Sequence, residues 1–154
     1  MVSLKRAFLI GAITLMVLTT RAIASDLTVM IIDSKSARPL HHKKVCLLFS
    51  EGSQADVRYD ETTCGRSNDR GVVIVPAPKF PKTFLHVSVA TNDLLPCFAV
   101  PDGFPVADVI SRGVILANTC GTAKQQPNPM QGQIVIYAHQ MTFWEVLKAM
   151  GKLE

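Results

Sequence analysis

Short runs of β-branched and aromatic residues, each ended by turn-forming residues, limit most strongly how this chain folds. Runs of four to eight such residues are typical of strands, and turn signals at regular short intervals favour a sandwich of two sheets. We therefore expect an all-β, immunoglobulin-like sandwich of about seven strands. The expected strands are residues 27–33, 43–50, 55–62, 72–75, 84–90, 113–117 and 133–138.

Two regions depart from this pattern. Residues 55–62 are polar, and only Val57 and Tyr59 recur with the period of two that a strand requires, so this strand is expected at an edge. Residues 97–105 are rich in turn formers and predict a loop. Residues 106–112 precede the sixth expected strand and indicate a short helix.

The C-terminal residues 141–154 predict a helix. Thr142 and Glu145 are spaced as a capping box, in which the Thr oxygen accepts the amide three residues on and the Glu reaches back. The helix is expected to run to about Met150 and to end near Gly151, because glycine commonly follows a helix C-terminus. Its apolar residues are Phe143, Trp144, Leu147 and Met150.

Three alternatives exist for this apolar face. It can cap the open end of its own sandwich, it can contact a protein partner or a second copy, or it can lie on a membrane. Membrane contact is the least favoured, because Lys148 and Lys152 are the only cations on the helix.

Residues 1–24 have the three zones of a secretory signal peptide. Lys5 and Arg6 precede an apolar run, Ala7 to Leu18, and Ala22-Ile23-Ala24 supplies the small residues of a cleavage site. The apolar run has about a dozen residues, whereas a membrane span needs about 20. We therefore expect cleavage after Ala24, a secreted or periplasmic protein, and no stable membrane span afterwards.

Removal of the signal changes the charge balance. It lowers the number of basic residues from 16 to 13, against 12 acidic residues. The domain expected at residues 25–140 is then almost neutral, and it lacks the concentrated basic face that nucleic-acid binding requires.

Cys46, Cys64, Cys97 and Cys120 are the four cysteines of the chain. An even number of cysteines in an exported chain favours disulfides, and the spacing matches no zinc site. Three pairings are possible. The pairing of sequence neighbours, Cys46 with Cys64 and Cys97 with Cys120, is favoured.

No complete catalytic motif is present, and we expect no cofactor. His41 and His42 are adjacent, and neutral imidazoles bind zinc and copper well. In an extended segment, however, neighbouring side chains point to opposite sides, so the pair requires a turn before it can bind one metal ion.

The first half of the chain resembles a known pattern. Arg38-Pro39-Leu40 followed by Val45-x-Leu47, and the turn Asn68-Asp69-Arg70-Gly71, resemble the carboxypeptidase regulatory-like and transthyretin-like (prealbumin-like) β-sandwich domains. The resemblance covers about residues 26–91. The segment Asn118-Thr119-Cys120-Gly121 with the Trp-containing tail is similar to secreted bacterial proteins of this broad type. The resemblance implies an accessory, adhesive or scaffold role.

A non-enzymatic binding or structural module of a cell envelope is therefore the expected function. Two alternatives remain open: a small extracytoplasmic hydrolase or His-dependent metal-binding protein, and a subunit of an envelope assembly that docks through the C-terminal helix.

Overall fold

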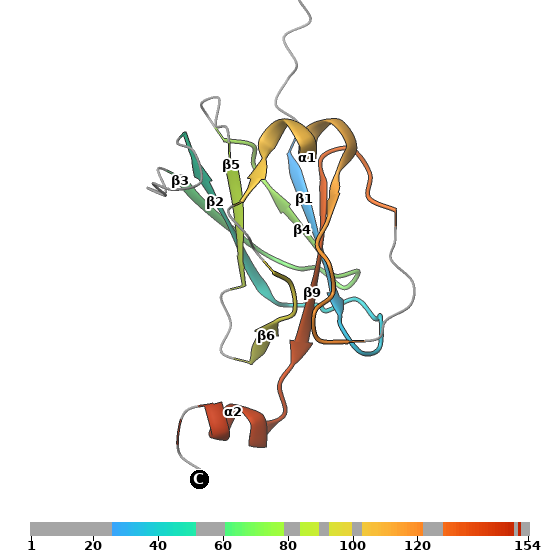
Figure 1. Ribbon diagram of the computed structural model, residues 1–154, viewed down its shortest axis with the longest axis vertical. Helices are drawn as coiled ribbons and strands as arrows, with labels where there is room; N and C mark the ends of the chain where they lie inside the picture. The colour runs from blue at the N-terminus through green and yellow to red at the C-terminus, as the bar shows by residue number, and fades with distance from the viewer. Residues whose placement is uncertain are drawn as a thin grey trace, which may run out of the picture.

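Two β-sheets pack face to face in the computed structural model, which describes residues 26–51, 61–78, 84–89, 93–99, 103–121, 128–149 and 151 (Figure 1). The prediction of an all-β sandwich with a short C-terminal helix is confirmed at this level. The described strands are β1 (Leu27–Asp33), β2 (Lys44–Ser50), β3 (Glu61–Arg66), β4 (Val72–Val75), β5 (Phe84–Val89), β6 (Leu94–Pro96), β7 (Phe104–Pro105), β8 (Val114–Ile115) and β9 (Gln133–Gln140). The helices are α1 (Val106–Arg112) and α2 (Phe143–Ala149).

One sheet, called sheet A here, has the strand order β4-β1-β9-β6, and β8 also pairs with β9. Strand β1 is antiparallel to β4 and parallel to β9, with Val29 opposite Ile134 and Ile31 opposite Ile136. The first six residues of β9 are all buried. This explains its continuous apolar run, because a central strand is covered on both faces.

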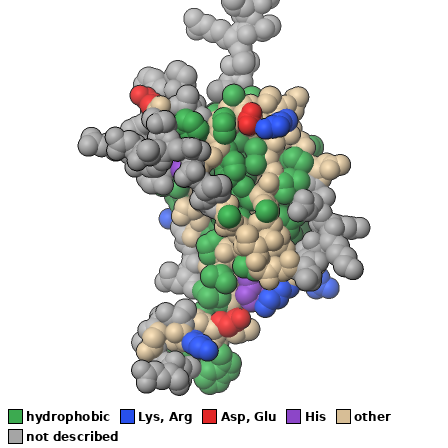
Figure 2. Space-filling view, viewed as in Figure 1, with side chains coloured by type: hydrophobic (Ala, Val, Ile, Leu, Met, Phe, Trp, Pro, Cys, Tyr) green, Lys and Arg blue, Asp and Glu red, His purple; other side chains and the backbone are tan. Residues whose placement is uncertain are grey.

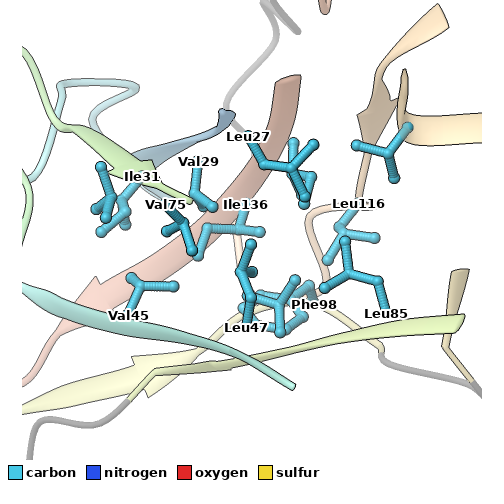
Figure 3. Close-up of a cluster of buried hydrophobic side chains, with 14 of the residues drawn as sticks. Leu27, Val29, Ile31, Val45, Leu47, Val75, Leu85, Phe98, Leu116 and Ile136 are labelled. Atoms are coloured by element: carbon cyan, nitrogen blue, oxygen red, sulfur yellow. The ribbon is translucent and has the colours of Figure 1, made fainter. Parts of the chain in front are cut away.

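The other sheet, sheet B, has the order β3-β2-β5-β7, and its strand pairs are antiparallel. Val45, Leu47 and Phe49 of β2 point inward and are fully buried. They meet the inward residues of sheet A and form one core (Figure 3). The core residues labelled there are Leu27, Val29, Ile31, Val45, Leu47, Val75, Leu85, Phe98, Leu116 and Ile136.

The predicted turn before β4 is present. The side-chain oxygen of Asn68 accepts the backbone N–H groups of Arg70 and Val72. Gly71 has φ 72°, and a Cβ there would lie 2.8 Å from both the Ile31 oxygen and the Pro39 side chain. Only glycine fits, since this backbone conformation and this close approach both exclude a side chain.

The predictions for the third strand and for the loop regions need correction. Most of the strand predicted at 55–62 lies outside the described residues, and the described edge strand is β3 at Glu61–Arg66. Its inward positions, Glu61, Thr63 and Gly65, are not apolar, so no period of two marked it. The loop predicted at 97–105 contains the very short strand β7, and no strand was predicted at the position of β6. The count in the described residues is therefore nine strands instead of seven.

Helix α1 and strand β8 occur where the sequence predicted a short helix followed by a strand. Gly113, between them, has φ 72°, and its N–H donates to the Val109 oxygen at the end of α1. Val106 and Val109 are the buried residues of this helix. Helix α1 therefore covers one end of the core, opposite the end from which α2 projects (Figure 1).

Both disulfides have the pairing of sequence neighbours that the sequence favoured: Cys46–Cys64 and Cys97–Cys120. Cys46 and Cys64 lie directly opposite each other in β2 and β3, on the outer face of sheet B. Cys97 is fully buried against Ile32, Val135 and Tyr137 on the outer face of sheet A. The second disulfide thus holds the segment after β8 over that face.

Candidate functional site at the junction of β9 and α2

Helix α2 begins with the predicted capping box. Glu145 Oε2 accepts the backbone N–H of Thr142 at 2.6 Å and the Thr142 hydroxyl at 2.9 Å, and the Glu145 N–H donates to Thr142 Oγ1 at 3.3 Å. The bonds from the Thr142 N–H and hydroxyl hold the pKa of Glu145 below its usual value, and His139 adds to this effect. The first turn of α2 is therefore well defined.

The aromatic residues of α2 do not pack into the sandwich. Phe143 is 69% exposed and Trp144 is 68% exposed, and their rings make an edge-to-face contact with centroids 5.6 Å apart. Leu147 is half-buried, and Met150 lies outside the described residues. Of the three alternatives for the apolar face, capping of its own sandwich therefore does not hold for the two aromatic residues.

Figure 2 shows the consequence, with green apolar side chains on the projecting end formed by α2. Leu95 of β6, which pairs with His139 of β9, is a further apolar residue exposed on sheet A, at 47%. Phe143, Trp144 and Leu95 are called the docking surface below. Large aromatic residues are enriched at protein interfaces, and tryptophan is enriched among their hot spots.

His139 joins α2 to the sandwich. Its side chain is 15% exposed, and its Nε2 lies 3.5 Å from Glu145 Oε1 of α2 and 3.2 Å from Lys35 Nζ. Its Nδ1 lies 3.9 Å from Asp33 Oδ2 at the end of β1. One imidazole therefore faces two carboxylates and one ammonium group that come from two segments, the end of β1 with its turn and α2.

Asp33 is held in place by the turn that follows β1. Its Oδ1 accepts the N–H of Lys35 at 3.2 Å, and the N–H and the hydroxyl of Ser36, each at 2.7 Å. Burial alone would raise the pKa of Asp33, but these bonds and one from the Gln140 backbone outweigh it and lower the pKa. Asp33 is therefore an anion beside His139 at neutral pH.

Three buried polar atoms lie on this outer face of sheet A without a hydrogen-bond partner: Ser34 Oγ, Tyr137 Oη and His139 Nδ1. Ser34 and Tyr137 are fully buried. Burial also raises the pKa of the Tyr137 hydroxyl, because the ionised form loses its hydration. Polar atoms of this kind reduce stability, and proteins retain few of them.

Replacing Tyr137 with Phe is expected to raise the free energy of unfolding by about 1 kcal/mol, because it removes a buried hydroxyl that has no partner. Denaturation by urea at neutral pH, compared with the parent protein, measures this change. A loss of stability in Tyr137→Phe would show that the hydroxyl makes a stabilising bond.

The histidines that the sequence singled out lie elsewhere. His41 and His42 are exposed, and their rings are in edge contact, with centroids 5.3 Å apart. His42 has φ 58°, so the segment is not extended, and the opposite orientation that an extended segment would impose does not apply here. His42 Nε2 lies 3.6 Å from Asp69. Within the described ranges, no three His, Cys, Asp or Glu side chains are arranged to hold a metal ion.

Sequence reasoning missed the junction of Asp33, Lys35, His139 and Glu145. A partial signal was present, because Tyr137 and His139 have the same parity and therefore share one face of the last strand. That Asp33 and Lys35 would lie beside His139 could not be predicted, since the parallel pairing of β1 with β9 joins residues that are far apart in the sequence.

No described helix has the length and apolar character needed to cross a membrane. Comparisons with known proteins find no match to this chain among protein-family models, curated proteins or solved structures.

Proposed function

We propose that this protein is an exported, non-enzymatic binding module that docks a protein partner through α2. The observation that carries the proposal is the exposed pair Phe143 and Trp144 on a helix that projects from the sandwich. The proposed class of sandwich is prealbumin-like, supported by the two facing sheets and by the Asn68–Gly71 turn. The proposed location is secreted or periplasmic.

Two observations support export. Residues 1–24 have the three zones of a secretory signal. All four cysteines are joined in disulfides. Disulfides of this kind form and persist in oxidising compartments and are rare in reducing ones.

The length of α2 supports docking. The helix has seven residues, whereas an isolated helix shorter than about 12 residues is marginal in water. Most of the stability of a short helix comes from packing its apolar face. Since the aromatic residues of α2 do not pack on their own sandwich, contact with a partner supplies the missing stabilisation.

The partner proposed is another protein with an apolar groove. A fully enclosed aromatic side chain buries about 150–250 Å². With about two-thirds of that area exposed on Phe143 and Trp144, two α2 helices that met would each bury roughly 200–350 Å² on these residues. A stable interface buries about 800 Å² per partner. A groove that encloses α2 and also contacts Leu95 covers more of the surface than a second α2 does.

The charge of α2 argues against a membrane surface as the occupant. Its described charged residues are Glu145 in the first turn and Lys148 in the last, so they balance. Helices that lie on anionic membranes are rich in Lys and Arg on their polar face.

Site-specific photo-crosslinking in cells that produce the protein tests the proposal. Lys148 lies one helical turn after Trp144, so the photoreactive residue p-benzoyl-phenylalanine at position 148 samples the docking surface. We expect one crosslinked adduct of defined mass that contains a different protein. The same residue at Ile110, which is 46% exposed on α1, is the matched control and should give no such adduct.

The partner identified in this way is then purified and its affinity is measured. Phe143→Ala with Trp144→Ala should weaken binding about 1,000-fold, since a hot-spot residue contributes about 2 kcal/mol or more and two of them about 4 kcal/mol. Ile110→Ala should change the affinity less than twofold. An adduct with a second copy, or co-sedimentation of the protein with phosphatidylglycerol vesicles, contradicts the proposed partner.

A further inference from the structure

We infer that His139 is a proton-operated latch that fixes α2 against the sandwich when it is protonated. The inference concerns the regulation of the docking surface, and for that role it rests on the proposed function. The latch itself does not depend on a partner and is testable in the isolated protein.

The two neighbours of His139 Nε2 require opposite protonation states. Lys35 Nζ, at 3.2 Å, is a donor, so it bonds to Nε2 only when that nitrogen carries no proton. Glu145 Oε1, at 3.5 Å, is an acceptor and bonds to Nε2 only when it does carry a proton. Lys35 and Glu145 therefore compete for the same nitrogen.

When His139 is neutral, the bond from Lys35 determines which ring nitrogen carries the proton. When Nε2 accepts from Lys35, the ring proton is on Nδ1 and points toward Asp33 Oδ2, 3.9 Å away. In this state α2 has no hydrogen bond to the imidazole. Its described backbone link to the sandwich is the bond from the Met141 N–H to the Asp93 oxygen, just before the helix begins.

Protonation reverses the preference. The imidazolium repels the Lys35 ammonium, whose side chain is exposed and free to move into solvent. Its two N–H groups then face Asp33 on β1 and Glu145 on α2. These two carboxylates and Lys35 are the charged groups of the described residues that face His139. An ion pair then links the sandwich to the first turn of α2.

Histidine as a residue type changes its charge between about pH 5 and 8, so this is the range over which the latch is tested. A fixed α2 presents Phe143 and Trp144 in one orientation. This lowers the entropy that binding must remove, and affinity rises when a binding element is pre-organised. We therefore expect tighter docking in acid than at neutral pH.

Trp144 is a direct reporter, because it is the single tryptophan of the chain and lies on α2. Time-resolved fluorescence anisotropy of the purified protein, from pH 8 to pH 5, measures the local motion of this side chain. We expect the residual anisotropy to rise on acidification with one midpoint. An unchanged anisotropy overturns the latch.

Three variants identify the groups responsible. His139→Gln should abolish the pH dependence, because glutamine does not titrate in this range. Glu145→Gln should also abolish it while keeping the helix cap, since Gln serves in a capping box as well. His42→Gln changes an exposed histidine in the segment before β2 and should leave the pH dependence unchanged. A pH dependence that persists in His139→Gln overturns the latch.

Nitrogen-15 NMR of the imidazoles gives an independent test. At pH 8 we expect His139 to carry its proton on Nδ1, and at pH 5 on both nitrogens. A proton on Nε2 at pH 8 contradicts the competition between Lys35 and Glu145.

Affinity measurements at two pH values distinguish this inference from the proposed function. For the crosslinked partner, affinity should be up to about fivefold higher at pH 5.5 than at pH 7.5, the size expected for one partly exposed ion pair. His139→Gln should remove this difference. Loss of binding in the aromatic variants with no effect of pH on either readout overturns the latch alone. If the anisotropy depends on pH but crosslinking finds no partner protein, only the docking role is overturned.

Discussion

Reducing both disulfides is expected to lower the free energy of unfolding by about 6 kcal/mol, about 3 kcal/mol for each bond. The cysteines are 18 residues apart in one disulfide and 23 apart in the other. Loops of this size lose about 3 kcal/mol of chain entropy in the unfolded state when they are closed. Small domains are stable by only about 5–15 kcal/mol, so the reduced protein should be close to its unfolding midpoint at room temperature. Urea denaturation with and without dithiothreitol measures the change.

Variants that lack one pair of cysteines separate the two contributions. Replacing Cys97 and Cys120 with Ala should cost more than replacing Cys46 and Cys64, although the loops are similar in length. Cys97 is fully buried against Tyr137, Ile32 and Val135, whereas Cys46 and Cys64 join strands that are already paired by hydrogen bonds. Equal unfolding midpoints in the oxidised and reduced proteins would contradict a structural role for both bonds.

Ile136→Ala is expected to lower the free energy of unfolding by about 2–5 kcal/mol, the usual cost of removing a large side chain from a packed core. Ile136 is fully buried on β9, which pairs with β1, β6 and β8, and its side chain points toward sheet B in Figure 3. The cavity left behind lies between the two sheets and cannot close without moving β9.

Ile74→Ala is the matched control for this substitution. The same side chain is removed from β4, but Ile74 is 61% exposed, and the expected change is within about 0.5 kcal/mol. Thermal unfolding of both variants at one pH makes the comparison. Similar losses in the two variants would mean that the outer face of sheet A is covered by something other than solvent.

Sequence patterns predicted the strands whose side chains alternate or are wholly apolar. In β1, β2 and β5 the inward residues are apolar and recur with a period of two, whereas β9 is marked by its continuous apolar run. The turn at Asn68 to Gly71 was also predictable, because its hydrogen bonds and its positive φ depend on residues within the turn itself.

Elements that depend on distant residues were not predictable in the same way. The inward face of β3 has Gly65, which packs against Val73 of the other sheet and leaves no room for a side chain. Strands β6 and β7 are two or three residues long, and they form only because β9 and β5 lie beside them. A single-segment pattern contains no information about such neighbours.

The candidate site also combines features that are local in the sequence with contacts between distant residues. The capping box and the aromatic residues of α2 were readable, because they are local to the helix. That the aromatic residues are exposed was not readable, since an apolar helical face is equally compatible with burial in the sandwich. The contacts of His139 with Asp33 and Lys35 depend on the parallel pairing of β1 with β9, which only the folded chain shows.

The pairing of β1 with β9 also governs when this chain folds. It brings Thr28 into hydrogen-bond contact with Gly132, 104 residues later. Contacts across such separations make folding slow, because a long loop must close before the contact stabilises anything. While the chain is being synthesised, β1 lacks its main partner until the last strand has emerged. Sheet A can therefore be completed only after β9 has been synthesised, whereas the pairs β2–β3 and β2–β5 of sheet B need no residue beyond Val89.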